Sequence, residues 1–127
     1  MRLSHQRKFI FLAYPRTASR TIRTFLNPIS DVKGIAAQDV SPENPFYVHI
    51  DASNAGKALE RAGHRWADYY SFAFVRHPYT RVQSLYRMYL SSYVGEEGSG
   101  RHVSDAFSWT DYIDRYIKVR PFREDAA

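Results

Sequence analysis

FIFLAYPRTASRTIRTFL at residues 9–26 and YSFAFVRHPYTRVQSLYRMYL at residues 70–90 decide what kind of fold this 127-residue chain can form. Each stretch begins with an apolar run, passes through a proline and continues with apolar residues at helical spacing. A continuous apolar run of this length is typical of a strand that is buried on both faces. Each stretch therefore predicts a strand, a turn and a helix, with basic and hydroxyl side chains gathered in the turn.

A further strand and helix are predicted between these two stretches. Residues 46–50 (FYVHI) form a short apolar run, and Asp51 or Ser53 can cap a helix that ends near Gly63. Strand–helix units that follow one another predict a parallel sheet with right-handed crossovers. The sequence thus predicts an α/β protein with a three-layer, P-loop-like fold, in which helices flank a small parallel sheet.

The length of the chain fits one domain over residues 1–127. Residues 1–8 are polar and basic, and we expect them to form a flexible arm. Residues 28–46 and 94–103 are expected to be loops, and a last helix is expected over residues 105–119. Because three parallel strands make only a small sheet, we expect a domain that is incomplete at its C-terminus or that forms a homo-oligomer.

The composition favours an anionic partner. The chain has 18 Lys and Arg against 13 Asp and Glu, although a solvated basic face would give the same excess. It has no cysteine, which excludes disulfides and thiolate metal sites and fits a reducing compartment. The apolar run at residues 9–14 is too short to cross a membrane or to serve as a signal peptide. We therefore expect a cytoplasmic protein with no membrane partner.

The first turn, PRTASRT at residues 15–21, carries groups that can bind an anion. Ligands of parallel sheets bind beyond the carboxyl ends of the strands, where helix N-termini offer unpaired backbone N–H groups. The side chains that add charge or hydroxyl groups there are Arg16, Thr17, Ser19, Arg20 and Thr21. On this segment alone, an ordinary turn with exposed arginines is an equally good interpretation.

The second turn offers a guanidinium and a hydroxyl at a fixed spacing. Arg76 ends the predicted strand, Pro78 stands where helices accept proline, and Ser84 lies two turns into the helix. A guanidinium that binds in bidentate fashion, together with a helix hydroxyl, can hold a second phosphate. The alternative is that Arg76 pairs with an acidic neighbour while Ser84 is a neutral helix position.

In order and spacing, the two turns resemble motifs of the sulfotransferases that use 3′-phosphoadenosine 5′-phosphosulfate (PAPS), especially the carbohydrate sulfotransferase branch. PRTASRT at residues 15–21 is similar to the family's P-[KR]-x-[GA]-[ST]-x-[ST], which binds the 5′-phosphosulfate. FAFVRHPYTRVQSLYR at residues 72–87 is similar to F-x-F-V-R-x-P-x-x-R-x-x-S-x-Y-R, which binds the 3′-phosphate. The resemblance covers roughly residues 9–93, most of the chain.

The resemblance implies transfer of a sulfuryl group from PAPS to a hydroxyl acceptor such as a glycan, without a metal. It implies that Arg76 and Ser84 hold the 3′-phosphate. The residues implied to hold the 5′-phosphosulfate are Arg16, Thr17, Ala18, Ser19, Arg20 and Thr21. Arg16 stands where lysine is usual and, because it stays charged, can act only electrostatically on the leaving oxygen.

The proposed reaction also needs a general base, and a histidine titrates in the right range. His49 in YVHIDAS resembles the family's histidine at the end of a strand that precedes a helix, so we predict that His49 is this base. A histidine that merely packs at a strand end is the alternative.

Other classes of function remain compatible with the sequence. A non-catalytic module could bind PAPS or adenosine 3′,5′-bisphosphate (PAP) without an acceptor site. A P-loop-type kinase is disfavoured because G-x-x-x-x-G-K-[ST] is absent. A specific nucleic-acid binder is disfavoured because the chain has no recognised nucleic-acid-binding motif.

Overall fold

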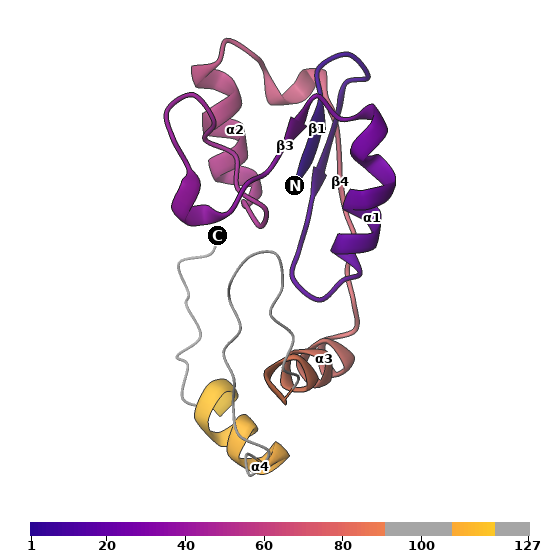
Figure 1. Cartoon of the computed structure of the whole chain (residues 1–127), viewed down its shortest axis with the longest axis vertical. Helices are drawn as coiled ribbons and strands as arrows, with labels where there is room; N and C mark the ends of the chain where they lie inside the picture. The colour runs from indigo at the N-terminus through magenta and orange to yellow at the C-terminus, as the bar shows by residue number, and fades with distance from the viewer. Residues whose placement is uncertain (91–107, 119–127) are drawn as a thin grey trace. The chain divides into compact units, whose positions relative to one another are not determined.

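A computed structural model of the chain describes residues 1–90 and 108–118, which belong to two compact units (Figure 1). The first unit is Met1–His77 and the second is Pro78–Ala127. Each unit is described by itself below. The loop predicted at residues 94–103 lies outside the described residues.

The first unit is built on a mixed sheet with the strand order β3-β1-β2-β4. Its strands are β1 (Arg2–Ser4), β2 (Phe9–Leu12), β3 (Val32–Lys33) and β4 (Tyr70–Ala73). β2 and β4 pair in parallel, as the sequence predicted, but β1 runs antiparallel to both β2 and β3. The fold is therefore mixed α/β, and the prediction of an all-parallel sheet is wrong.

The first residues form a strand and not the flexible arm that was predicted. Met1, Leu3 and Ser4 are fully buried, and Leu3 lies opposite Ile10 of β2. The buried guanidinium of Arg2 donates to Asn27 Oδ1 at 2.6 Å and to the Met1 carbonyl at 2.9 Å. Polar groups buried in this way are satisfied by hydrogen bonds, so the polar composition of the segment concealed its burial.

Residues 46–50 do not form the predicted strand. Tyr47 makes only an isolated bridge with Ile35, where Val48 N–H donates to the Ile35 carbonyl at 2.9 Å. The close approach depends on Gly34, because a Cβ there would lie 2.8 Å from the Tyr47 carbonyl carbon. The segment is therefore held against the connection that follows β3, while its apolar side chains still enter the core.

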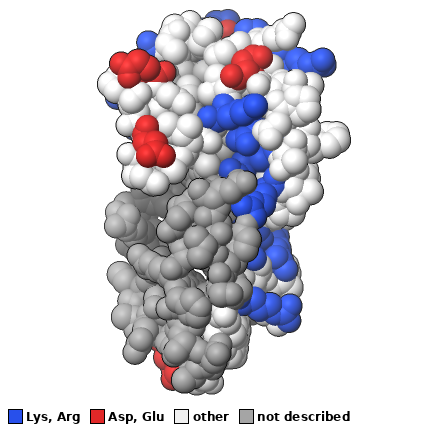
Figure 2. Space-filling model, viewed as in Figure 1, with Lys and Arg blue, Asp and Glu red and all other residues white. Residues whose placement is uncertain are grey.

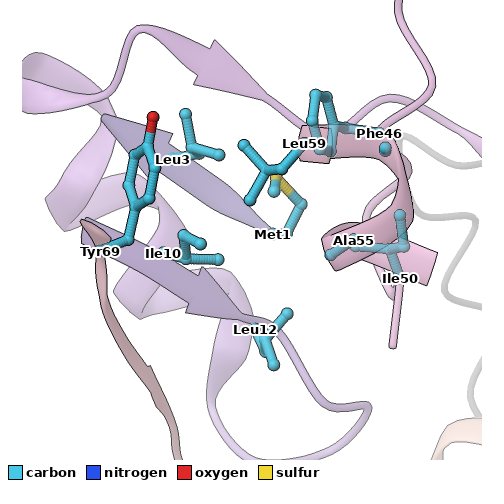
Figure 3. Close-up of a cluster of buried hydrophobic side chains, with 10 residues drawn as sticks. Met1, Leu3, Ile10, Leu12, Phe46, Ile50, Ala55, Leu59 and Tyr69 are labelled. Carbon is cyan, nitrogen blue, oxygen red and sulfur yellow. The ribbon is translucent and has the colours of Figure 1, made fainter. Parts of the chain in front are cut away.

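Two helices cover opposite faces of the sheet. On one face, Ile10 and Leu12 pack with Leu59 of α2 (Ala52–Arg61), as Figure 3 shows for the larger cluster. On the other face, Phe11 packs with Leu26 of α1 (Ser19–Leu26). The alternation follows from the period of two along β2, because successive side chains point to opposite faces.

The limits of α2 agree with the prediction. Asp51 caps the helix, since its carboxylate accepts from Asn54 N–H at 2.8 Å and from Asn54 Nδ2 at 2.6 Å. Gly63 ends it with a φ of 79°, a left-handed conformation that lets His64 N–H donate to the Leu59 carbonyl at 2.9 Å. The capping residue, Asp51, stands only two residues after His49.

The second unit contains α3 (Pro78–Leu90), α4 (Trp109–Tyr112) and a π-helical segment, Ile113–Lys118. Within this unit, the ring of Tyr86 lies 5.1 Å from Trp109 and 5.4 Å from Tyr112 between centroids. α3 agrees with the helix predicted in the second stretch, and α4 with the π-helical segment lies within the helix predicted over residues 105–119, although Ser108 is the N-cap and not part of it. None of the helices over residues 1–90 and 108–118 is long and apolar enough to span a bilayer.

A cluster of titratable rings lies at the turn between β1 and β2. The imidazole of His5 contacts that of His64 in a tilted arrangement, with centroids 4.3 Å apart, and His5 Nδ1 lies 2.6 Å from Tyr69 Oη. Burial lowers the pKa of His5, and the charge on His64 lowers that pKa further. Asp31 opposes these effects and raises the His5 pKa, whereas Lys8 lowers it.

The stability of the first unit is expected to decrease as the pH falls through 6.5, the ordinary pKa of histidine. The fold favours neutral His5, so the unfolded chain binds more protons in this range and the free energy of unfolding falls. Urea unfolding at about pH 7.5 and about pH 5.5 measures the difference. His5→Gln should reduce this difference in the free energy of unfolding, and His77→Gln should not. An unchanged difference in His5→Gln would contradict the assignment of the pH dependence to His5.

Candidate functional site

The loop between β2 and α1 has the backbone shape of an anion-binding turn. Arg16 and Ala18 both have left-handed conformations, with φ of 63° and 59°. Left-handed residues separated by a single intervening residue make a concave turn, in which backbone N–H groups can converge on an anion. The loop follows the buried end of β2, so the sheet holds its position.

The start of α1 leaves its first N–H groups without a side-chain cap. The N-cap residue is Ala18, which has no capping side chain, and the first turn contains no acidic residue. The positive end of the helix dipole therefore faces the loop, with no capping side chain to compensate it. This arrangement suits an anionic oxygen supplied by a ligand.

The polar residues of the loop and of the first turn of α1 divide into buried and exposed ones. Thr17 is buried, and its Oγ1 donates to the Tyr14 carbonyl at 2.9 Å, which fixes the loop. Ser19 is also buried, whereas Arg20 and Thr21 are exposed on α1. Thr17 thus has a structural role that the sequence did not reveal, in addition to the backbone N–H it contributes to the turn.

His49 is held against the end of β2. Its Nδ1 lies 2.5 Å from the carbonyl oxygen of Ala13, the residue that follows β2. A carbonyl only accepts hydrogen bonds, so Nδ1 carries the proton and Nε2 carries the lone pair. The imidazole is exposed to solvent. It therefore has the tautomer and the accessibility that a general base requires.

Arg76 joins the second turn to the first. It follows β4, whose Ala73 lies opposite Leu12 of β2 in the parallel pair. Its Nη1 donates to the carbonyl of Arg16 at 3.4 Å, a long hydrogen bond. The structure thereby brings Arg16, His49 and Arg76 to the same end of the sheet, as predicted from the strand order.

Ser84 lies within α3, in the second unit, and is half-buried there. Its cooperation with Arg76 in binding a phosphate therefore stays a prediction. Among the residues that the structure describes, no three His, Asp or Glu side chains are grouped as metal ligands would be.

A groove of about 750 Å³ lies between α2 and the β2–β4 pair. Tyr14, which lies between β2 and α1, lines it, and the other aromatic residues of its lining are Trp66 and Phe72. The polar side chains along it are Ser53, Lys57, Glu60 and Ser71. Sequence reasoning did not identify this groove. The spacing of Ser53, Lys57 and Glu60 along one side of α2 was the available signal.

Basic side chains dominate part of the surface of the first unit. On the face shown in Figure 2, several Lys and Arg side chains of this unit lie close together. A surface of this kind raises the local concentration of an anionic ligand.

Replacing Ala18 with glycine is expected to stabilise the protein by about 1 kcal/mol, because an L-residue in the left-handed region is strained and glycine is not. Thermal or urea unfolding measures the gain. The matched control is Ala36→Gly, at a φ of −66°, which should not stabilise the protein. Equal effects of the two substitutions would show that the loop is not strained at Ala18.

These features place two basic turns and an oriented imidazole at the carboxyl end of a parallel strand pair, an arrangement suited to an anionic ligand. The family model described as "Sulfotransferase family" matches residues 1–111, and the chain belongs to this family. Comparison with curated proteins and with solved structures gives no match. Family membership confirms the resemblance at the level of the family and indicates sulfuryl transfer. The carbohydrate branch and the three-layer P-loop-like arrangement stay predictions.

Proposed function

We propose that this protein transfers the sulfuryl group of PAPS to a hydroxyl group of an acceptor such as a carbohydrate. The observation that carries the proposal is the meeting of three groups at one end of the sheet. His49 is bonded to the end of β2, and Arg76 is bonded to the loop that contains Arg16. A base and two anion-binding turns are what sulfuryl transfer from a doubly phosphorylated nucleotide requires.

The loop and the start of α1 would hold the 5′-phosphosulfate through N–H groups of residues 17–21. Arg16 would neutralise the charge that develops on the oxygen bridging sulfur and phosphorus. Arg76, with Ser84, would hold the 3′-phosphate and so set the position of the sulfur along the loop.

His49 would remove the proton from the acceptor hydroxyl through Nε2. The acceptor oxygen then forms a bond to sulfur while the bond between sulfur and the 5′-phosphate oxygen breaks. PAP and the sulfated acceptor are the products, and the proton on His49 passes to solvent. The Ala13 carbonyl keeps its bond to Nδ1–H throughout and stabilises the imidazolium that forms.

The groove between α2 and the sheet supports an acceptor with rings and hydroxyl groups. Its aromatic walls, Tyr14 and Trp66, can contact the apolar face of a ring, while its polar side chains can bind hydroxyls. Tyr14 belongs to the same loop as Arg16, so one end of the groove opens beside the proposed donor site.

Calorimetric titration with PAP tests the donor site. We expect a dissociation constant of about 10 μM or lower, and at least about tenfold weaker binding of adenosine 5′-monophosphate, which lacks the 3′-phosphate. Absence of PAP binding would contradict the proposal. Sulfation assays with PAPS and a panel of hydroxylated acceptors then test turnover. Binding of PAP without turnover on any acceptor would support the non-catalytic module.

A further inference from the structure

The outer edge of β4 lacks the features that protect exposed strands. β4 ends the strand order β3-β1-β2-β4, and within the described part of the chain no strand pairs with its outer side. Residues 69–75 (YYSFAFV) contain no charged residue and no proline. Natural proteins usually place lysine or proline on such an edge to prevent pairing. An unprotected edge of this kind indicates a strand that is paired in the working protein.

The backbone groups that face this edge can be identified. Tyr70 N–H donates to the Lys8 carbonyl at 2.8 Å, so Tyr70 directs its backbone toward β2. Because successive residues of a strand direct their N–H and C=O groups to opposite sides, Ser71 and Ala73 direct theirs outward. These two residues supply the donors and acceptors with which a further strand would pair.

Over residues 70–74, the large and the small side chains lie on opposite faces of the sheet. Tyr70, Phe72 and Phe74 lie on the face that α1 covers. The ring centroid of Phe72 lies 5.8 Å from that of Tyr70 and 6.3 Å from that of Phe74. Ser71 and Ala73 lie on the other face. Tyr70 is 74% exposed and Phe74 is 45% exposed, although both are large and aromatic. This edge therefore leaves apolar surface uncovered on one face.

Phe25 of α1 extends the same surface. Ile22 and Leu26 face the sheet, and Asn27 binds Arg2 of β1, so the flank of α1 that bears Asn27 lies over β1. Successive helical residues are about 100° apart, which places Phe25 on the opposite flank, toward β4. Its side chain is 79% exposed. The aromatic surface therefore continues from the strand edge onto the helix.

We propose that two copies of this chain pair through β4, antiparallel, about a twofold axis beside Phe72. In this register Ser71 lies opposite Ala73 of the partner subunit, and the two exchange backbone hydrogen bonds. Phe72 lies opposite Phe72 of the partner subunit in a pair without such bonds, where side chains approach most closely. The two four-stranded sheets join into one.

The pattern of residues favours a second copy over an unrelated strand. Antiparallel pairing about Phe72 places Tyr70 opposite Phe74 of the partner subunit, so aromatic side chains face aromatic ones and small side chains face small ones. Aromatic cross-strand pairs of this kind are favourable. The absence of charge in residues 69–75 removes repulsion at the contact, although the chain carries a net charge of +5. A twofold contact is also closed, so it does not propagate into fibres.

The size of the contact is adequate. Large aromatic side chains bury roughly 150–250 Å² each, so Tyr70, Phe74 and Phe25 of both copies, with the paired backbone, would bury on the order of 1,000 Å². This is near the lower limit for a specific interface. We therefore expect a dimer that is stable at micromolar concentration and that dissociates on dilution.

Sedimentation analysis of the full chain tests the proposal. The native protein is expected to be a dimer, and Ser71→Lys with Ala73→Lys should raise the dissociation constant by roughly 100-fold or more, since like charges then face each other. The control Ala37→Lys with Gln38→Lys adds the same charge at exposed positions far along the chain and should remain dimeric. A monomeric native protein, or a lysine variant at β4 that stays dimeric, would overturn the proposal.

Cysteine cross-linking tests the register and does not depend on the lysine variant folding. The chain has no cysteine, so Ser71→Cys and Ala73→Cys each introduce a single thiol. Mixing the two variants under oxidation should give covalent dimers, because positions 71 and 73 lie opposite each other with Cα atoms about 5.5 Å apart. Each variant alone should cross-link much less. Equal cross-linking in the unmixed samples would overturn the proposed pairing.

Discussion

Replacing His49 with alanine is expected to lower kcat for sulfuryl transfer by roughly 100- to 10,000-fold, the range for loss of a general base. The dissociation constant for PAP should change little, because His49 is assigned to the acceptor side of the reaction. The measurement is steady-state sulfation with saturating PAPS, together with calorimetric titration of PAP on the same preparation.

The control for this experiment is His5→Gln. His5 follows β1 at the opposite end of β2 from the loop that precedes α1, so its replacement should leave kcat near the native value at neutral pH. A kcat close to native in His49→Ala would contradict the role of His49. Equal loss of PAP binding and of kcat would instead indicate that His49 supports the loop structurally.

Replacing Arg76 with alanine is expected to weaken PAP binding by roughly 10- to 100-fold, which corresponds to the loss of charge-assisted hydrogen bonds to a phosphate. Binding of adenosine 5′-monophosphate should be nearly unchanged, since it has no 3′-phosphate to contact. The PAP affinity of Arg76→Lys should lie between that of the native protein and that of Arg76→Ala, because an ammonium group keeps the charge but cannot bind in bidentate fashion.

The matched control for Arg76 is Arg61→Ala, which removes one exposed arginine from the last turn of α2. It should leave PAP affinity within about twofold, as expected for a distant surface charge that is screened by salt. Equal weakening by the two substitutions would show that only the overall charge matters. Equal weakening of PAP and adenosine 5′-monophosphate in Arg76→Ala would contradict the assignment to the 3′-phosphate.

Features with local causes could be predicted from the sequence. The apolar run of β2 and the spacing of Ile22 and Leu26 specified a strand followed by α1. Asp51 and Gly63 specified both ends of α2, because a cap and a left-handed terminator act over a single turn of chain. The parallel pairing of β2 with β4 followed from the alternation of strands and helices.

Features with distant causes could not be predicted. β1 is only three residues long, too short for any period to be visible, and it is a strand because it pairs with both β2 and β3. Residues 46–50 have the composition of a strand, but their contact with Gly34 decides where they lie. Such contacts join residues far apart in the sequence, and composition does not record them.

The candidate site shows the same division. Arg16, His49 and Arg76 were placed at one end of the sheet by the order of the elements. The bond from Thr17 to the Tyr14 carbonyl and the bond from His49 to the Ala13 carbonyl depend on the path of the folded chain. Lys57 and Trp66 line the groove because α2 crosses the sheet at a particular place, which the sequence does not specify.

The bonds that orient His49 and Arg76 have one property in common: both acceptors are peptide carbonyls, of Ala13 and Arg16. Every amino acid supplies the same carbonyl, so exchanging the side chain at position 13 leaves the acceptor for His49 in place. Side chains at position 13 are therefore limited by volume, since Ala13 is only 2% exposed, and not by hydrogen-bonding chemistry. Divergent members of the family that share these two carbonyl acceptors could carry different side chains at both positions and still orient the same imidazole and the same guanidinium.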